Sequence, residues 1–158
     1  MYDTESFIKD VEILFKANLN AELLLIDTEK GDYILNPINE NAWYLHNLQE
    51  EVFSYSHFVL ISMRSNVSVS EPSEYSYNKE VMLDIEICMP DEGDDDVTNI
   101  FWQLLRYTRA LETIVFKNFD SFQGITKLKV NSLIPAEYPF KGKLIRSAGV
   151  SVSAKMAS

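Results

Sequence analysis

Hydrophobic residues follow a helical pattern from Val97 to Phe119, the longest such pattern in the chain. Neither Gly nor Pro interrupts it, and Lys117 lies in the last turn, where positive charge favours a helix C-terminus. Spacings of three and four residues predict one common face, formed by Phe101, Leu104, Leu105, Thr108, Leu111 and Val115. Segments typical of β-strands lie on both sides of this helix in sequence. We therefore expect the helix to pack across a sheet to which both flanking segments contribute.

Two segments before this helix alternate between apolar and polar residues, as β-strands do. One runs from Phe58 to Ser70; the clearer one runs from Lys79 to Met89, and Pro90 is expected to end it. In the clearer segment, one predicted face consists of Val81, Leu83, Ile85, Ile87 and Met89, and the other of Met82, Asp84, Glu86 and Cys88. We predict a long antiparallel β-hairpin with the polar stretch 71–78 at its tip.

Two further alternating segments follow the helix. In the first, Leu128 and Val130 are predicted to face the core, opposite Lys127 and Lys129. In the last, one predicted face consists of Ala148, Val150, Val152, Ala154 and Met156, and the other of Ser147, Ser151, Ser153 and Lys155. Between them, the proline-containing stretch 134–143 is predicted to be a loop. The order of elements predicts an α+β fold with a mainly antiparallel sheet.

The N-terminal region predicts a second helix, from Ser6 to about Leu25, with Thr4 or Ser6 as its cap and Gly31 as a stop. Asn18 and Asn20 leave open whether it is one helix or two short ones. The pattern from 32 to 57 is weaker: Pro37 indicates a loop, and a short helix from Ala42 to Val52 is possible. This region contains four aromatic residues: Trp43, Tyr44, Phe53 and Tyr55. They either fold against the body of the protein or are held by a partner, and we expect the first because aromatic clusters are usually part of a core.

Composition indicates one folded domain spanning residues 1–158. The chain is 46% hydrophobic and 12% aromatic, enough to form a core at this length. Its apolar runs are too short to cross a bilayer, and the polar start has no signal-peptide pattern. Cys88 is the only cysteine, which excludes an internal disulfide and favours a cytoplasmic setting.

The net charge of −10 is unevenly distributed. Residues 121–158 contain six basic residues and one acidic residue, a net charge of +5, whereas residues 1–120 contain eight basic and 23 acidic residues, a net charge of −15. The two halves either neutralise each other within one fold or form one acidic and one basic surface for head-to-tail contacts. The overall acidity argues against a general nucleic-acid-binding protein.

The sequence has few candidates for catalytic or metal chemistry. His46 and His57 lack the spacing of a zinc site, and Cys88 lies beside acidic residues that oppose thiolate formation. No nucleotide-binding glycine motif occurs, and no cofactor is expected. The alternating carboxylates Asp84 and Glu86 could hold a divalent cation or lie on a half-exposed strand face. The acidic run 91–96 does not have the spacing of an EF-hand loop.

Arg106, Tyr107 and Arg109 interrupt the polar side of the predicted central helix. Arg109 can form an ion pair with Glu112, three residues further on, which would make this a solvated helix face. Alternatively, the three residues contact a neighbouring chain, since Arg and Tyr are enriched at the centres of interfaces.

The order of elements resembles a family of bacteriophage proteins. A strand pair, an acidic loop, a helix containing LLRYTRAL (104–111) and a final strand reading LIRSAGVSVSAKM (144–156) are similar to the tail terminator, or tail-completion, proteins of long-tailed phages. The resemblance covers residues from Val59 to the C-terminus and, more loosely, the N-terminal helix. It implies a non-enzymatic virion protein, assembled in the host cytoplasm, that forms a hexameric ring on the head-proximal end of the tail tube.

The resemblance also implies partners for such a ring. These are further copies of the chain, the tail tube protein, a head-completion or neck protein, and the sheath protein in a contractile tail. DNA would only pass through the channel, and no membrane is involved. An acidic channel lining would repel DNA phosphates and let the DNA pass.

Contacts with copies or partners are expected at charged and aromatic positions. These are Glu71, Tyr75 and Tyr77 in the hairpin tip, Asp94, Asp95 and Asp96 before the central helix, Arg106, Tyr107 and Arg109 on it, and Lys141, Lys143 and Arg146 near the last strand. Two other functions stay open: another neck or tube-like phage component, and a metal-dependent enzyme using Asp84 and Glu86.

Overall fold

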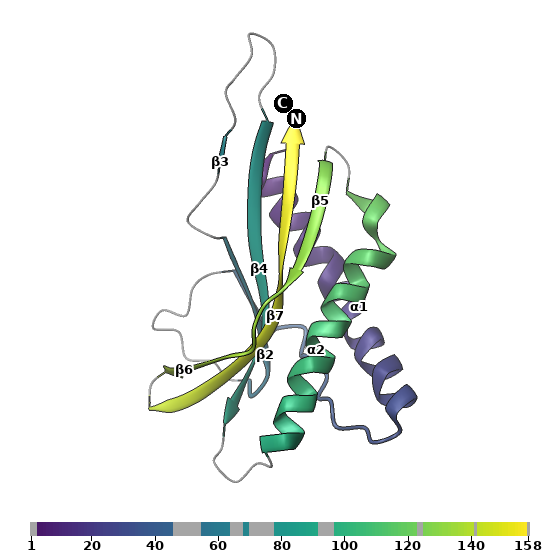
Figure 1. The fold of residues 1–158 in the computed structure, drawn as a ribbon, viewed down its shortest axis with the longest axis vertical. Coiled ribbons are helices and arrows are strands. Elements are labelled where there is room, and N and C mark those ends of the chain that lie inside the picture. Colours follow the sequence, from purple (N-terminus) through teal and green to yellow (C-terminus); the bar gives the residue numbers. More distant parts are fainter. Residues whose placement is uncertain are drawn as a thin grey trace.

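The protein is described by a computed structural model over residues 3–45, 55–63, 68–69, 78–91, 97–122, 125–140 and 142–157. These residues form two α-helices, one short 3-10 helix and seven strands (Figure 1). In chain order they are α1 Thr4–Lys30, β1 Trp43–Tyr44, β2 Phe58–Met63, β3 Ser68–Val69, β4 Asn78–Asp91, α2 Val97–Lys117, η1 Phe119–Ser121, β5 Ile125–Ser132, β6 Ala136–Phe140 and β7 Lys143–Ala157. The predicted α+β class with a mainly antiparallel sheet is confirmed.

The sheet joins the two segments that flank α2 in sequence, as predicted. Its strand order is β1-β2-β4-β7-β5, with β3 on β4 and β6 on β7. The long strands β4 and β7 run antiparallel from the pair Asn78 and Ala157 to the pair Asp91 and Leu144. β2 is also antiparallel to β4, whereas β1 pairs parallel with β2. Much of the connection between β2 and β4 lies outside the described residues, so the long hairpin stays a prediction.

Strand β4 has the alternation that its sequence predicts. The predicted core face is buried, from Val81 to Met89 at odd positions, while Asp84 and Glu86 on the other face are half-buried. The prediction that Pro90 ends this strand was wrong, because Pro90 lies opposite Ile145 and the strand continues to Asp91. Proline has no N–H to donate to a neighbouring strand. It is tolerated near the end of a strand, where the sheet does not require that hydrogen bond.

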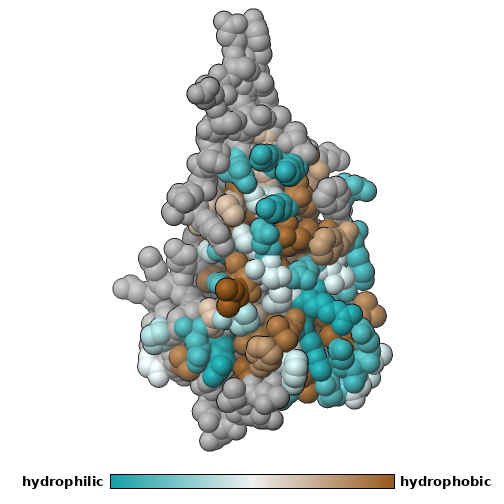
Figure 2. Space-filling view, in the orientation of Figure 1, coloured by the Kyte–Doolittle hydropathy of each residue, from teal (hydrophilic) through white to brown (hydrophobic). Residues whose placement is uncertain are grey.

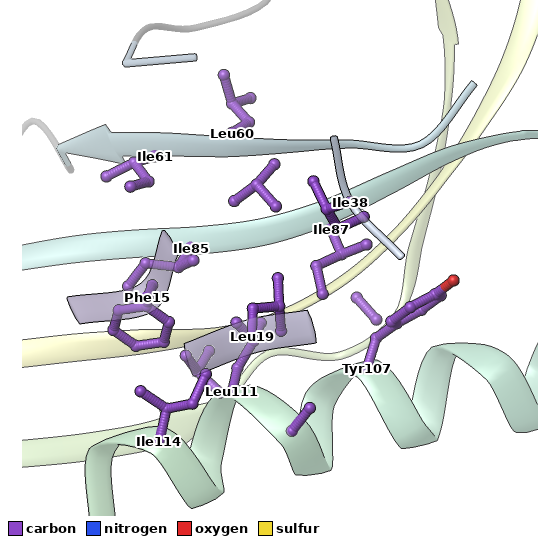
Figure 3. Close-up of a cluster of buried hydrophobic side chains, with 14 of the residues drawn as sticks. Phe15, Leu19, Ile38, Leu60, Ile61, Ile85, Ile87, Tyr107, Leu111 and Ile114 are labelled. Atoms are coloured by element: carbon purple, nitrogen blue, oxygen red, sulfur yellow. The ribbon is translucent and has the colours of Figure 1, made fainter. Parts of the chain in front are cut away.

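One hydrophobic core lies between the sheet and the two helices. Figure 3 shows Phe15 and Leu19 of α1 and Leu111 and Ile114 of α2 on the side of the sheet where Ile85 and Ile87 of β4 lie. All of these side chains are almost completely buried. Burial of side chains of this size stabilises the fold by about 1.5–3 kcal/mol each, so this core fixes how the helices lie on the sheet.

Helix α1 is one uninterrupted helix, longer than predicted. Asp3, rather than Thr4 or Ser6, is its N-cap, and its carboxylate accepts a hydrogen bond from the Ser6 N–H at 2.8 Å. Gly31 ends the helix in the left-handed conformation with φ of 75°, as expected for a C-cap glycine. Asn20 does not break the helix, because its side-chain amide pairs with both backbone groups of Ile38 at 2.8 Å.

The segment after α1 joins the edge of the sheet, where β1 pairs with β2. The predicted helix starting at Ala42 was wrong at its beginning, where Trp43 and Tyr44 form β1; residues 46–54, including Phe53, lie outside the described part. The predicted packing of Trp43, Tyr44 and Tyr55 against the core is confirmed.

The prediction of a loop over 134–143 was wrong for most of its length. Ala136–Phe140 form β6, which pairs with the start of β7, and Gly142 between them has a φ of 76°. Because β6 is an edge strand, Pro139 removes no hydrogen bond that a further strand would need.

Gly149 allows β7 to approach β4 closely. A Cβ atom at this position would lie 2.1 Å from the carbonyl oxygen of Ile85. Since that contact is with backbone, a neighbouring side-chain rotation cannot relieve it. Glycine is therefore the residue that this crossing point requires.

Candidate interaction surface

Helix α2 buries four of the six residues predicted for its core face: Leu104, Thr108, Leu111 and Val115. Its core face is formed by Ile100, Leu104, Tyr107, Leu111 and Ile114, with Gln103, Thr108, Ala110 and Val115 beside them. Phe101 and Leu105, which the spacing assigned to the core, are instead 48% and 40% exposed. The prediction was wrong for these two residues only, because apolar residues occur on more than one side of this helix and spacing alone did not determine its exact rotation.

A second apolar face of α2 points away from the core. At about 100° per residue, Phe101, Leu105 and Phe116 project from one side of the helix, with Trp102 at its edge. The charged residues Arg109 and Glu112 lie on the same side, between Leu105 and Phe116. We call the four apolar residues the α2 outer face; they are 40% to 68% exposed. The rings of Phe101 and Trp102 lie 5.5 Å apart between centroids. Figure 2 shows apolar side chains exposed among hydrophilic ones on the side of the molecule that includes α2.

Helix α1 also exposes apolar residues. Ile13, Leu24 and Leu25 are 57% to 67% exposed, and Ala17 and Ala21 between them are exposed as well. We call these five residues the α1 outer face. From position 13 to 25, Lys16 is the only charged residue among the exposed ones. A helix face that is uncharged over three turns is unusual for a surface in contact with water alone.

Arg106 fastens the end of α1 to α2. Its guanidinium forms a bidentate salt bridge with the Asp32 carboxylate, with N–O distances of 2.6 and 2.8 Å, and lies 4.0 Å from the Asp27 carboxylate. The hydrogen bond from Arg106 holds the pKa of Asp32 below its usual value. The Arg106 side chain is only 14% exposed, so little of its surface is accessible to another chain.

Tyr107 lies inside the protein. Its hydroxyl accepts a hydrogen bond from the Asn36 N–H at 3.1 Å and donates one to the Asn36 carbonyl at 3.3 Å. Burial raises the pKa of Tyr107 to about 12. The side chain has no exposed surface in this conformation, so its predicted role at a partner interface has no support from its position.

Arg109 pairs with α1 rather than with its own helix. Its guanidinium lies 2.7 Å from the Glu29 carboxylate and holds the pKa of Glu29 below its usual value. The predicted pairing with Glu112 was wrong, because Glu112 accepts a hydrogen bond from Ser132 of β5. Lys117 likewise reaches Glu22 of α1 at 2.6 Å. These pairs hold the two helices in a fixed relation, with both outer faces exposed.

The other predicted contact residues are only partly described. Arg146 lies 3.4 Å from Glu137 on the neighbouring strand β6. Lys143 belongs to β7 by its backbone. Lys141 and the remaining candidates, at the hairpin tip and before α2, lie outside the described residues: Glu71, Tyr75, Tyr77, Asp94, Asp95 and Asp96.

Asp84 and Glu86 lie on the half-buried face of β4, opposite Ser151 and Gly149 of β7. Within the described ranges, no group of three His, Cys, Asp or Glu side chains is close enough together to hold a metal ion.

Comparisons of the chain with protein-family models and with curated protein sequences give no match. In the part of the chain that the structure describes, neither helix is both long and apolar enough to cross a membrane.

Proposed function

We propose that this chain is a structural subunit of a phage tail, which forms a ring at the head-proximal end of the tail tube. The ring would end tube polymerisation and join the tail to the neck. The observation that carries this proposal is the exposed apolar surface on α1 and α2. Such a surface is costly to leave in water, and in soluble proteins it is typical of contacts with other chains.

The architecture is consistent with the resemblance in the sequence. A helix, a strand pair, the helix with LLRYTRAL and the final arginine-led strand occur in the expected order. Edge strand β5 also has a free side within the described part of the sheet, since its one strand neighbour there is β7. Free edges and apolar helix faces are both means by which a small subunit joins a larger assembly.

The location and copy number of the chain in phage particles test this function. Intact particles and isolated tails would be purified from the native source, and the copies of this chain counted by quantitative mass spectrometry. A ring predicts a small, fixed number of copies per tail, in a multiple of six, at the head-proximal end. Many copies per particle would identify a tube-like subunit instead, and absence from every particle would overturn the proposal.

Removal of the gene gives an independent test. Without a terminator, tail tubes should lose length control and fail to join heads, which electron microscopy of the lysate would detect. Normal tails joined to heads in the absence of the chain would contradict the proposed role.

A further inference from the structure

We infer that the outer edge of β5 binds an extended segment of another protein, in which apolar and acidic residues alternate. The segment would pair with β5 as an additional strand of the sheet, which is a recurring mode of peptide recognition. The binding edge and the chemistry of its partner go beyond the proposed function and do not depend on it.

The backbone of β5 directs alternate hydrogen-bonding groups away from the sheet. Just beyond the end of β5, the Leu133 N–H donates to the Gly149 carbonyl of β7 at 2.9 Å. In an antiparallel pair, residues that bond to the neighbouring strand alternate with residues whose N–H and C=O groups point the other way. The register of β5 with β7 is regular over these residues, so the backbone groups of Ser132, Val130 and Leu128 point outward.

These outward groups are open to a partner. Strand β7 is the one neighbour of β5 in the described part of the sheet. The N–H and C=O groups of Leu128, Val130 and Ser132 therefore have no strand opposite them there, along an edge of about 13 Å. An edge of this kind is a template for pairing with another chain.

The side chains of the same residues form an apolar row on the helix side of the sheet. Leu128 and Val130 pack against the core but are only half-buried, as expected at a sheet edge. Ile134, two residues beyond Ser132, is 88% exposed, more than any other large hydrophobic residue in the described ranges. Apolar side chains of an added strand, opposite Leu128 and Val130, would share their face and cover them.

Lysines occupy the other face of this edge. Lys127 and Lys129 are exposed, and among the described residues neither forms an ion pair. Lys127 lies directly opposite Lys155 of β7, a pair of like charges that costs stability. Lys155 also has Glu80 opposite it on β4, so the unmatched charge is that of Lys127 and Lys129. Acidic side chains opposite these two lysines would match it, while the residues between them face the apolar row.

The lysines also select against a second copy of this edge. Antiparallel pairing of β5 with β5 of another copy would bring the lysines of both copies together on one face. Like charges on facing strands destabilise a pair, and lysine on an edge strand is a common means of blocking such contacts. An acidic segment is attracted by the same charges, which separates it from a copy of this chain.

A designed peptide tests the inference. It has eight residues in which valine and glutamate alternate, and N-methyl groups on one backbone edge prevent it from pairing with itself. NMR of the full isotope-labelled chain measures binding and amide hydrogen exchange. In the free protein, the outward amides of Leu128, Val130 and Ser132 should exchange quickly, whereas those of Lys129 and Asn131, which bond to β7, should exchange slowly. Saturating peptide should slow the three outward amides at least tenfold.

Two control peptides separate strand pairing from charge attraction alone. One has the same composition with its glutamates in a block, and the other alternates valine with lysine. Both should bind at least tenfold more weakly, and binding of the alternating glutamate peptide should weaken as salt is raised. Equal binding of either control would overturn the inference. So would no binding of the alternating glutamate peptide to the folded chain at millimolar concentration.

Substitutions on β5 give matched controls in the protein. Val130→Pro removes an outward N–H but no hydrogen bond to β7, and it should weaken binding at least tenfold. Val130→Ala keeps the N–H and should lose less. The double reversal Lys127→Glu with Lys129→Glu is a second test that remains if the proline variant does not fold. It should bind the lysine peptide in preference to the glutamate peptide, and an unchanged preference would overturn the inference.

The outcomes also distinguish the β5 edge from the proposed function. Self-association of the chain that Val130→Pro abolishes in sedimentation would assign the edge to a second copy and overturn the partner inferred here. A chain that is found on phage tails but does not bind the peptide refutes the edge and leaves the function intact. Peptide binding by a chain absent from phage particles refutes the function and supports the edge.

Discussion

The two apolar faces of α2 have similar residues but different surroundings. Leu111 on the core face has no exposed surface, whereas Leu105, six positions earlier on the same helix, is 40% exposed. The core face contacts the sheet and α1 of its own chain; within the described residues the outer face is left to solvent. Helical periodicity therefore identifies apolar positions on α2, but it does not say which of them its own chain buries. The apolar positions that stay exposed are candidates for contact with another chain.

Replacing Leu111 or Leu105 by alanine should give the largest difference in stability between the core face and the outer face. Leu111→Ala should lower the free energy of unfolding by about 2–5 kcal/mol, because it opens a cavity in a packed core. Leu105→Ala should change it by less than about 0.5 kcal/mol in the monomer. Urea unfolding followed by circular dichroism measures both. Equal losses for the two variants would mean that the outer face is covered within the chain.

Loss of the Tyr107 hydroxyl should have the next largest effect. Tyr107→Phe removes the hydroxyl that forms part-buried hydrogen bonds with the N–H and carbonyl of Asn36, which should cost about 0.5–1.5 kcal/mol. An unchanged urea midpoint would show that water replaces the hydroxyl.

The same tyrosine also predicts an alkaline effect. Its pKa is raised in the folded state from 10.0 to about 12, so the folded protein holds this proton more tightly. The stabilisation is complete below pH 10, the unfolded value, and is lost as the pH rises through about 12. Stability curves between these two values should fall less steeply for Tyr107→Phe.

The two arginines of α2 should differ in how much they stabilise the fold, and both contributions should be lost at acid pH. Arg106 and Arg109 lower the pKa values of Asp32 and Glu29, respectively. Each pair therefore stabilises the fold above the unfolded carboxyl pKa and loses this contribution as the pH falls through the lowered one. Arg106→Gln should destabilise more than Arg109→Gln, because the Arg106 side chain is 14% exposed and that of Arg109 is 48% exposed. Thermal unfolding at neutral and acid pH measures the difference, and equal losses would contradict it.

Polar substitution on the outer face should have the smallest effect on folding. Leu105→Asp should leave the monomer's free energy of unfolding within about 0.5 kcal/mol of the original but weaken association with other chains, since it would place a charge among the exposed apolar residues to which the proposed function assigns such contacts. Sedimentation measures association, with Glu40→Gln as the control. Unchanged association of Leu105→Asp would place the contact elsewhere.

Much of the sheet was predictable because strand periodicity is local. The face formed by Val81, Leu83 and Ile85 follows from alternation alone, and Leu128 and Val130 follow in the same way. The β6 strand was missed because the two prolines of its segment indicated a loop. Prolines are tolerated on an edge strand, and the position of that strand is known only from the assembled sheet.

The candidate surface was harder to predict. The sequence predicted partner contacts for Arg106, Tyr107 and Arg109. In the structure these side chains form hydrogen bonds with α1 and with the segment after it. A signal for the outer faces was nevertheless present: Trp102 and Phe116 do not fit the single face assigned to α2. An excess of apolar residues over one face could have been interpreted as a second surface.

The sequence by itself determined the two helices and the long strands, the alternation of β4 and the end of α1 at Gly31, because each depends on neighbours within a few residues. Only the tertiary structure decided the exact rotation of α2, which leaves Phe101 and Leu105 exposed, and which carboxylate each arginine meets. Glu29 and Arg109 are 80 positions apart, and a helix that is apolar on two sides can pack with either one. The rotation of α2 therefore follows from how closely its side chains fit the sheet and α1.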